Sequence, residues 1–187
     1  AAGIAHSDSE ENLGQASSPA YLDTANGRVA LIAASAYLPS EQNRAANQRV
    51  DVRGKPGVNA LGFETTFVVD AQSFQALQRL GTSLGFDDQR QRVIDHGFHS
   101  DAQIGAATQT EYKYRGDRYL LGDAFDIRTA CDQNDVEKNL RQLREARRQA
   151  DWLIVSLHSQ DLIGRSWLTA KKRTEVTEQP DFVRDFA

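Results

Sequence analysis

His158 is the residue of this sequence best placed for chemistry. It follows the apolar run Trp152–Leu157, and Ser156, Ser159 and Asp161 supply oxygen atoms around it. A neutral imidazole is the commonest side-chain ligand of transition metals, and an adjacent oxygen can fix its tautomer. The alternative is a histidine whose ring nitrogens only form hydrogen bonds with a neighbouring loop. A Ser-His-Asp hydrolase is disfavoured, because the sequence contains no Gly-X-Ser-X-Gly motif.

The remaining histidines and the one cysteine are weaker candidates. His6, His96 and His99 are expected to be surface-loop residues, although each could supplement a site. Cys131 cannot form an internal disulfide, and no second Cys or Cys-His spacing makes a zinc motif with it. We expect Cys131 to be a structural, buried thiol.

A second stretch with possible chemistry is "RGKPGVN", which begins at Arg53. Its glycines and proline permit a tight turn with positive backbone dihedrals, and Arg53 and Lys55 could meet an anion there. A simple turn is the favoured interpretation. The stretch belongs to a long connection, Tyr37–Leu61, and connections of that length in compact domains are usually functional or flexible. No dinucleotide fingerprint, phosphate loop or His-Glu-X-X-His motif occurs.

The elements that position these residues follow from the apolar pattern. Residues 27–36, "GRVALIAASA", predict a strand buried on both faces, and residues 63–70, "FETTFVVD", predict a β-branched and aromatic strand. A helix is expected in residues 71–85, and residues 86–110 are ambiguous, with a broken helix followed by a loop. Alternating aromatic and polar residues around Arg115, Gly116 and Asp117 predict a β-hairpin within residues 110–123.

The clearest predicted unit is strand, helix, strand. The strand is "FDIRTA", residues 125–130; the helix covers residues 135–150; and the second strand is "WLIVSL", residues 152–157. This order is typical of a βαβ crossover in a parallel or mixed sheet. His158 would then be the first polar residue beyond the carboxyl end of a central strand, where open α/β sheets bind their ligands.

The sequence also predicts the cap and the buried face of this helix. Asn134 can cap its first turn, with Glu137 three positions on. Val136, Leu140 and Leu143 mark the expected buried face.

The composition indicates which classes of partner are not expected for this chain. The formal net charge is -4, which gives no electrostatic reason to expect nucleic acid or an anionic membrane. The local basic clusters "NLRQLREARRQA" and "TAKKRT" are interpreted as solvated faces. No apolar run approaches the roughly 18 residues that a membrane span requires.

The ends of the sequence indicate a larger protein. None of the 187 residues is methionine, and the final stretch "QPDFVRDFA" predicts a helix that begins at Pro180 and stops after about two turns. We therefore expect residues 1–187 to be part of one domain, with both termini cut from a longer chain.

Several segments, in order, resemble the CapA-type poly-γ-glutamate capsule synthesis family. They are "GIAHSDSEENLGQASSPAYLDTANGRVALIAASA", "DVRGKPGVNALGFETTFVVD", "ADWLIVSLHSQD" and "QPDFVRDFA". The second is similar to that family's Arg-Pro-Gly-X-Asn-Pro-Leu-Arg segment and the third to its strand ending in histidine. Together they cover most of the chain.

The resemblance implies an α/β fold: a mixed-sheet sandwich flanked by helices, metallophosphoesterase-like (αββα) and incomplete in this chain. It implies a divalent metal (Mn, Zn, Fe or Mg) that assists hydrolysis of a phosphoester or an anionic polymer such as poly-γ-glutamate. His158 is the implied catalytic and metal-binding residue; Arg53, Gly57 and Asn59 are implied substrate-binding residues of a covering loop. His6 lies where the family often has a polar residue near the site.

The departures from the family pattern leave an alternative open. The chain reads Asn59-Ala60-Leu61-Gly62 where the family has Asn-Pro-Leu-Arg, so one arginine that could bind an anion is missing. The family's Gly-Asp, Asn-Leu-Glu, Asn-His and Gly-His-X-X-His segments would lie in the rest of the parent domain. The alternative is a non-enzymatic module on the same scaffold that binds or assembles an anionic polymer. An envelope or secreted location is implied by the family only.

Overall fold

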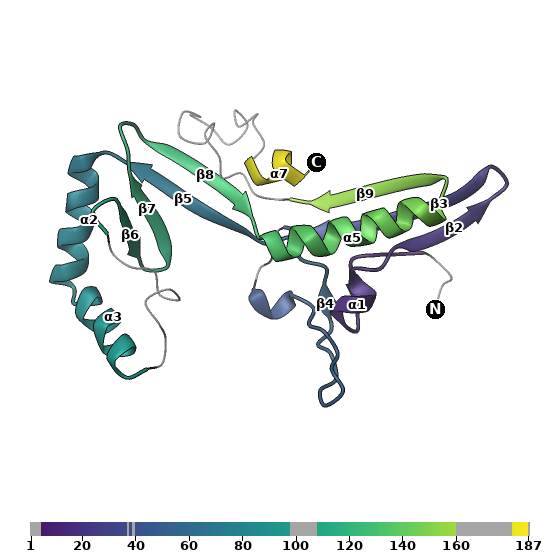
Figure 1. Ribbon diagram of the computed structural model, residues 1–187, viewed down its shortest axis with the longest axis horizontal. Coiled ribbons are helices and arrows are strands. Elements are labelled where there is room, and N and C mark those ends of the chain that lie inside the picture. The colour runs from purple at the N-terminus through teal and green to yellow at the C-terminus, as the bar shows by residue number, and fades with distance from the viewer. Residues whose placement is uncertain (1–4, 37, 39, 98–107, 160–180, 187) are drawn as a thin grey trace. The chain divides into compact units, whose positions relative to one another are not determined.

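The computed structural model describes residues 5–36, 38, 40–97, 108–159 and 181–186 (Figure 1). The chain divides into two compact units. Unit 1 comprises Ala1–Glu64, Cys131–Asp161 and Phe182–Ala187, and unit 2 comprises Thr65–Ala130 and Leu162–Asp181. The division into units does not decide whether the whole chain belongs to one domain, which stays a prediction.

Strands and helices are interspersed along the chain without regular alternation. Those assigned mainly to unit 1 are β1 (Ser9–Glu10), α1 (Leu13–Ala16), β2 (Ala20–Thr24), β3 (Gly27–Ser35), η1 (Glu41–Asn43), β4 (Gly57–Val58), α5 (Gln133–Gln149), β9 (Trp152–His158) and α7 (Asp181–Phe186). Those assigned mainly to unit 2 are β5 (Phe63–Val69), α2 (Ala71–Ser83), α3 (Phe86–Asp95), β6 (Glu111–Tyr114), β7 (Asp117–Leu121) and β8 (Asp126–Cys131). The helix expected near the end of the chain is confirmed by α7.

The main sheet of unit 1 has the order β2-β3-β9 and is mixed. β2 runs antiparallel to β3, whereas β9 runs parallel to β3 from the pair Val29 and Trp152 to the pair Ser35 and His158. α5 covers one face of this sheet (Figure 1). The core on that face consists of small and branched side chains, Ala30, Ile32, Ala146 and Ala150.

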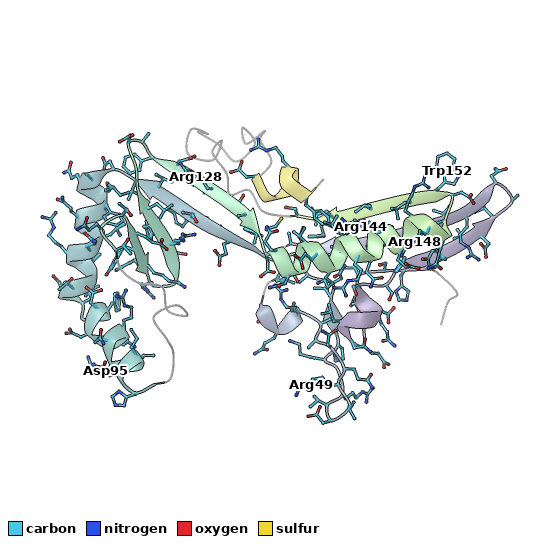
Figure 2. The ribbon with its side chains drawn as sticks, in the orientation of Figure 1. Arg49, Asp95, Arg128, Arg144, Arg148 and Trp152 are labelled. Atoms are coloured by element: carbon cyan, nitrogen blue, oxygen red, sulfur yellow. The ribbon has the colours of Figure 1, made fainter. Side chains whose placement is uncertain are left out.

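The prediction of a βαβ crossover is wrong, because its two strands, β8 and β9, belong to different sheets. β9 pairs with β3, while β8 belongs to the four-stranded sheet β6-β7-β5-β8. Among the described strands β9 is therefore an edge strand, not a central one. On its face away from α5, Trp152 is 65% exposed and Ile154 52% exposed, and Figure 2 shows the Trp152 ring projecting away from the sheet.

β3 is the strand that the sequence predicts, but complete burial on both faces is not observed. Its α5-facing residues Ala30, Ile32 and Ala34 are buried, whereas the alternate residues Val29, Leu31 and Ala33 are only partly buried. An apolar run alone does not distinguish these two environments, because a strand covered on one face can also carry apolar residues on the other.

The start of α5 differs from the expectation. Asp132, not Asn134, is the N-cap, and its carboxylate accepts hydrogen bonds from the backbone N–H groups of Asn134 and Asp135. One carboxylate that reaches two of the unpaired N–H groups leaves no capping role for Asn134.

The buried stripe of α5 is also displaced from the predicted one. Asp135, Asn139 and Ala146 are its buried residues, whereas Val136 and Leu140 are half-buried. Among the described residues, Leu143 of the predicted face packs against the cluster of Ala30, Ile32, Ala146 and Ala150. The polar residues are buried because each finds hydrogen-bond partners, which the hydrophobic pattern does not encode.

Unit 2 agrees with the sequence pattern. β5 and α2 are confirmed, α3 occupies part of the ambiguous region, and β6 and β7 form the expected hairpin. Asp70 caps α2, and Phe74 packs with Val69 and Tyr112 in the core of this unit. His96 follows the last turn of α3, and His99 lies outside the described residues.

The molecule is an α/β protein with mixed sheets flanked by helices, as expected. Cys131 is half-buried at the end of β8, less enclosed than predicted. No helix in the described part of the chain is long and apolar enough to cross a membrane.

Candidate functional site

His158 lies at the carboxyl ends of two parallel strands. It is the last residue of β9, not the first residue beyond it, and it is paired with Ser35, the last residue of β3. Its backbone carbonyl accepts a hydrogen bond of 2.9 Å from the N–H of Ala36, while its side chain is exposed. Parallel pairing of β3 and β9 therefore presents the imidazole at the end of the sheet.

The other side of the β3 terminus is occupied by the segment that begins at Asn59. The N–H of Ser35 donates to the carbonyl of Asn59 over 2.9 Å, and the N–H of Leu61 donates to the carbonyl of Ser35 over 3.0 Å. Ser35 and Ala60 form an isolated parallel bridge. The end of β3 thus lies between His158 and Asn59.

Asp8 joins this group from the N-terminal segment. The N–H of Asn59 donates to the backbone carbonyl of Asp8 over 2.6 Å, and Ser7 Oγ accepts from the N–H of Ala33 over 3.2 Å. Asp8 has a φ of 99°, an uncommon backbone conformation for a residue other than glycine. The contacts with Asn59 and Ala33 hold the segment in this strained conformation, and such strain is found at functional sites more often than elsewhere.

The Asp8 carboxyl group is electrostatically unusual. Burial raises the pKa of Asp8, and a hydrogen bond from the Asn59 backbone and the charge of His158 only partly oppose this effect. His158 is close enough for its charge to act on the Asp8 carboxyl group. Asp8 Oδ1 is buried and accepts no hydrogen bond within the described structure.

Asn59 supplies a second buried oxygen of the same kind. Its side chain is fully buried, and Nδ2 donates to the carbonyl of Ala33 over 2.9 Å and to Asn139 Oδ1 over 2.8 Å. Asn139 Nδ2 in turn donates to the carbonyl of Asp135 over 2.9 Å, so both amide orientations follow from their partners. Asn59 Oδ1 remains without a hydrogen-bond partner in the described structure.

A charged network beneath these residues joins α5 to the loop. Arg44 Nη1 donates to Asp135 Oδ2 over 2.6 Å, and the Gly62 N–H donates to the same oxygen over 2.8 Å. Lys138 Nζ donates to Asp135 Oδ1 and to the carbonyl of Ala60, each over 3.1 Å. The network fixes the backbone at Ala60 and at Gly62.

The predicted substrate-binding residues lie in different settings. Arg53 is on an exposed arm whose tip carries Arg49, labelled in Figure 2; the Arg53 side chain is 85% exposed and faces Glu11 at 3.6 Å. Gly57 is in β4, where a Cβ atom would collide with the backbone of Asn43. Of the three, Asn59 is the one that described hydrogen bonds connect to the β3 terminus beside His158.

The side chains around the end of β3 include donor types that bind divalent cations. Asp8 contributes a carboxylate, Asn59 an amide oxygen and His158 an imidazole, which are ligand types used for Mn, Fe, Zn and Mg. A cation bound at Asp8 or at Asn59 would satisfy a buried oxygen that has no hydrogen-bond partner in the described structure. Within the described part of the chain, no three His, Cys, Asp or Glu side chains form a group that could hold a metal ion. Asn59 would therefore have to act as a ligand, or further ligands would have to come from elsewhere.

The other histidines have separate settings. His6 is exposed and lies 3.2 Å from Glu10 Oε1, as expected of a surface-loop histidine. His96 is exposed at the end of α3, with Nδ1 2.6 Å from the carbonyl of Arg92.

Sequence reasoning missed Asp8, Asp135 and Asn139. Asp135 and Asn139 are four residues apart on α5, and this spacing puts them on one helix face, a signal that was available. For Asp8 the sequence carries no comparable signal, because neither a positive φ nor a buried oxygen follows from "HSDSE".

Known proteins provide relatives but no activity. No model of a protein family matches the chain. The uncharacterized proteins y4sH and y4uA of Sinorhizobium fredii are each 27% identical to it over 160 residues, or 85% of this chain and 31% of each relative. The chain thus spans less than a third of the length of these curated relatives.

Proposed function

We propose that the chain forms part of a CapA-like, metal-dependent hydrolase that acts on a phosphoester or on an anionic polymer such as poly-γ-glutamate. The observation that supports this proposal best is the pair of buried oxygens, Asp8 Oδ1 and Asn59 Oδ1, that have no hydrogen-bond partner in the described structure beside the strand end of His158. The ordered resemblance of the sequence to the CapA family supports it independently.

Each residue has a distinct role in the proposed site. The His158 imidazole provides a nitrogen ligand, and the Asp8 carboxylate provides an anionic ligand next to it. A divalent metal, when bound, supplies a Lewis acid that polarises the scissile group and favours ionisation of water near neutral pH. Asn59 contributes a neutral oxygen whose direction is fixed by its two N–H donations. The fixed amide limits the reorganisation needed on binding.

The charge balance of the site is consistent with cation binding. Partial burial raises the pKa of the Asp8 carboxyl group, and the hydrogen bond from the Asn59 backbone and the charge of His158 oppose this effect only in part. A cation next to the carboxylate would favour its charged form and reverse this shift. Metal binding is therefore expected to release protons and to weaken as the pH falls.

Metal content is the direct test. We would measure it by mass spectrometry on the purified chain, on His158→Ala and Asn59→Ala, and on His96→Ala as a matched histidine control. The proposal predicts near-stoichiometric metal in the chain and in His96→Ala, with at least about a tenfold loss of metal affinity in the other two variants. Equal metal content in all four proteins, or none in the parent chain, would count against a metal site at His158.

Hydrolysis should be tested in a longer natural polypeptide, since the chain spans only part of its relatives. The substrates are a generic phosphodiester and poly-γ-glutamate. We expect metal-dependent turnover that falls at least about a hundredfold in His158→Ala. Turnover that persists after metal removal would contradict the metal-dependent mechanism.

The second candidate is a non-enzymatic module that binds an anionic polymer. The observation in its favour is the exposed arm, where Arg49 and Arg53 carry cationic side chains into solvent. Binding of polyglutamate without metal, lost in Arg53→Ala but kept in Arg128→Ala, would favour this alternative. Metal-dependent turnover would favour the hydrolase.

A further inference from the structure

Unit 2 has a pocket of its own that shares no residue with the site at His158. It lies between α3 and the turn of the β6–β7 hairpin, and its volume is about 450 Å³. Pockets that hold small ligands usually have volumes of roughly 300 to 1,000 Å³, so this one is large enough for a ring-containing molecule. The lining residues that matter here are Phe86, Asp87, Arg90, Val93, Lys113 and Arg115.

The apolar part of the lining comes from α3. Phe86 and Val93 both line the pocket and are half-buried. The ring of Phe86 packs edge-on against Tyr114 of β6, with ring centroids 5.5 Å apart. This contact restrains Phe86, so the pocket offers a preformed apolar surface on which a ring can pack.

The charged part of the lining is predominantly cationic. Lys113 and Arg115 line the pocket from the hairpin with exposed side chains, and no described residue pairs with either. The one acidic lining residue, Asp87, already accepts hydrogen bonds from Tyr112 Oη at 3.2 Å and Thr82 Oγ1 at 2.7 Å. The carboxylate is thus held by neutral hydroxyl groups, and Lys113 and Arg115 remain available to an anion.

The hairpin turn adds an independent indication. Arg115 has a φ of 53° and Gly116 a φ of 100°, so both central residues of the turn have positive φ. Asn or Asp normally takes the first of these positions, because a larger side chain is disfavoured there. This chain instead has a cation at a conformationally costly position on the rim of the pocket. Such an outlier is a reason to look for a function of that side chain.

We propose that this pocket binds a small organic anion with an aromatic body. The ring packs on Phe86 and Val93, and the anionic group pairs with Lys113 and Arg115. Arg90, which also lines the pocket from α3, adds positive charge on the helix side. Phosphate, sulfonate and carboxylate groups share the charge that this rim recognises. The inference concerns unit 2 only and does not depend on the proposed hydrolase.

The test uses naphthalene-2-sulfonate, an aromatic anion that a phosphoesterase cannot hydrolyse. Isothermal titration on the full chain at low ionic strength should show saturable binding. Two substitutions remove the cations, Lys113→Gln and Arg115→Asn, and asparagine is chosen because it tolerates the positive φ of the turn. We expect the double variant to bind at least about tenfold more weakly, since two charge-assisted contacts are removed.

Three controls decide the ligand class. Arg92→Gln removes a cation from the same helix outside this lining and should leave the affinity unchanged. Naphthalene-2-methanol, which has the ring without the charge, should bind more weakly than the sulfonate. Inorganic phosphate, which has charge without the ring, should compete poorly. No saturable binding, an equal loss in Arg92→Gln and the double variant, or equal affinity for phosphate and the aromatic anion would each overturn the proposal.

Discussion

Asp8, which is half-buried, and Asp135, which is buried, are aspartates of the same unit whose carboxyl groups have opposite environments. Burial raises the pKa of both, but hydrogen bonds from Arg44 and Gly62 and the charge of Lys138 bring the pKa of Asp135 below its ordinary value. The pKa of Asp8 stays raised, because a backbone hydrogen bond and His158 do not offset its burial. One carboxylate is saturated with partners, and the other has a buried oxygen without any in the described structure.

The difference separates a structural carboxylate from a candidate functional one. Asp135 uses its hydrogen-bonding capacity to join α5 to the loop, so a ligand would have to compete with Arg44 and Lys138 for its oxygens. Burial disfavours the charged form of Asp8, and its protein contacts offset this effect only in part. A cation bound next to the carboxylate would stabilise the charged form. The two residues therefore differ most in whether a carboxylate oxygen is left without a hydrogen-bond partner in the described structure, and less in how deeply they are buried.

The largest effect is expected from Asp135→Asn, which leaves Arg44 and Lys138 without their shared anion. Breaking a buried ion pair in this way typically costs about 3 kcal/mol of unfolding free energy. Urea unfolding measures the loss, and hydrogen exchange of the α5 amides should locate it in unit 1. Asp23→Asn is the control, since the Asp23–Arg28 pair is largely exposed and should contribute much less. Equal losses in both variants would mean that the Asp135 network is not special.

The next largest effect concerns added metal. If Asp8, Asn59 and His158 hold a cation, manganese at a hundred times its Kd should raise the unfolding free energy by about 2.7 kcal/mol. Asp8→Asn should abolish most of this gain, while Asp135→Asn should retain it despite its lower starting stability. Urea unfolding with and without manganese gives the comparison. A gain that survives in Asp8→Asn would place the metal elsewhere.

A smaller effect of opposite sign is expected from the two carboxylates as the pH changes. The lowered pKa of Asp135 means that its stabilisation is complete above the ordinary aspartate value of 3.8 and is lost as the pH falls through the folded-state value. The raised pKa of Asp8 means that its contribution is present below 3.8 and is lost as the pH rises through the folded-state value.

Metal-free unfolding curves at several pH values test these signs. Asp8→Asn should become more stable relative to the parent chain as the pH rises from acid to neutral, because ionisation of Asp8 is removed. Asp135→Asn should show its full loss at neutral pH and less of it in strong acid. The same pH dependence in both variants would contradict the assigned environments.

The smallest effect is expected from Arg53→Ala. The Arg53 side chain lies in solvent and faces Glu11 at 3.6 Å, and exposed ion pairs of this kind contribute at most about 0.5 kcal/mol. Unfolding free energy and metal content should both stay close to those of the parent chain. A loss of metal in this variant would show that the exposed arm contributes to the site.

Local patterns predicted the elements well and their partners less well. β3, β5, α2 and the β6–β7 hairpin follow from apolar periodicity and turn residues, because that information lies within each segment. The partner of β9 does not, since pairing with β3 joins residues more than a hundred positions apart and any apolar strand would satisfy the local pattern. The βαβ prediction is wrong because it pairs β9 with β8, the strand that precedes it in the sequence, instead of with β3.

The candidate site was predicted in part. The position of His158 at a strand end followed from the apolar run before it, and Asn59 came from the family resemblance. Asp8 could not be found, because its burial and its backbone conformation depend on contacts with Asn59 and Ala33. Asp135 and Asn139 lie outside the buried face predicted from Val136, Leu140 and Leu143, because the hydrophobic pattern does not encode their buried hydrogen-bond partners.

The pairing of β3 with β9 also sets the order in which the protein can fold during its synthesis. The hydrogen bond from the Arg28 N–H to Asp151, next to this pairing, closes a separation of 123 residues. At roughly 5 to 20 residues per second, a ribosome needs on the order of ten seconds to deliver β9 after β3. Residues 65–130 of unit 2 leave the ribosome in that interval, whereas the apolar face of β3 stays uncovered until α5 follows. The β2–β3 hairpin is therefore expected to expose its apolar face until α5 has been synthesised.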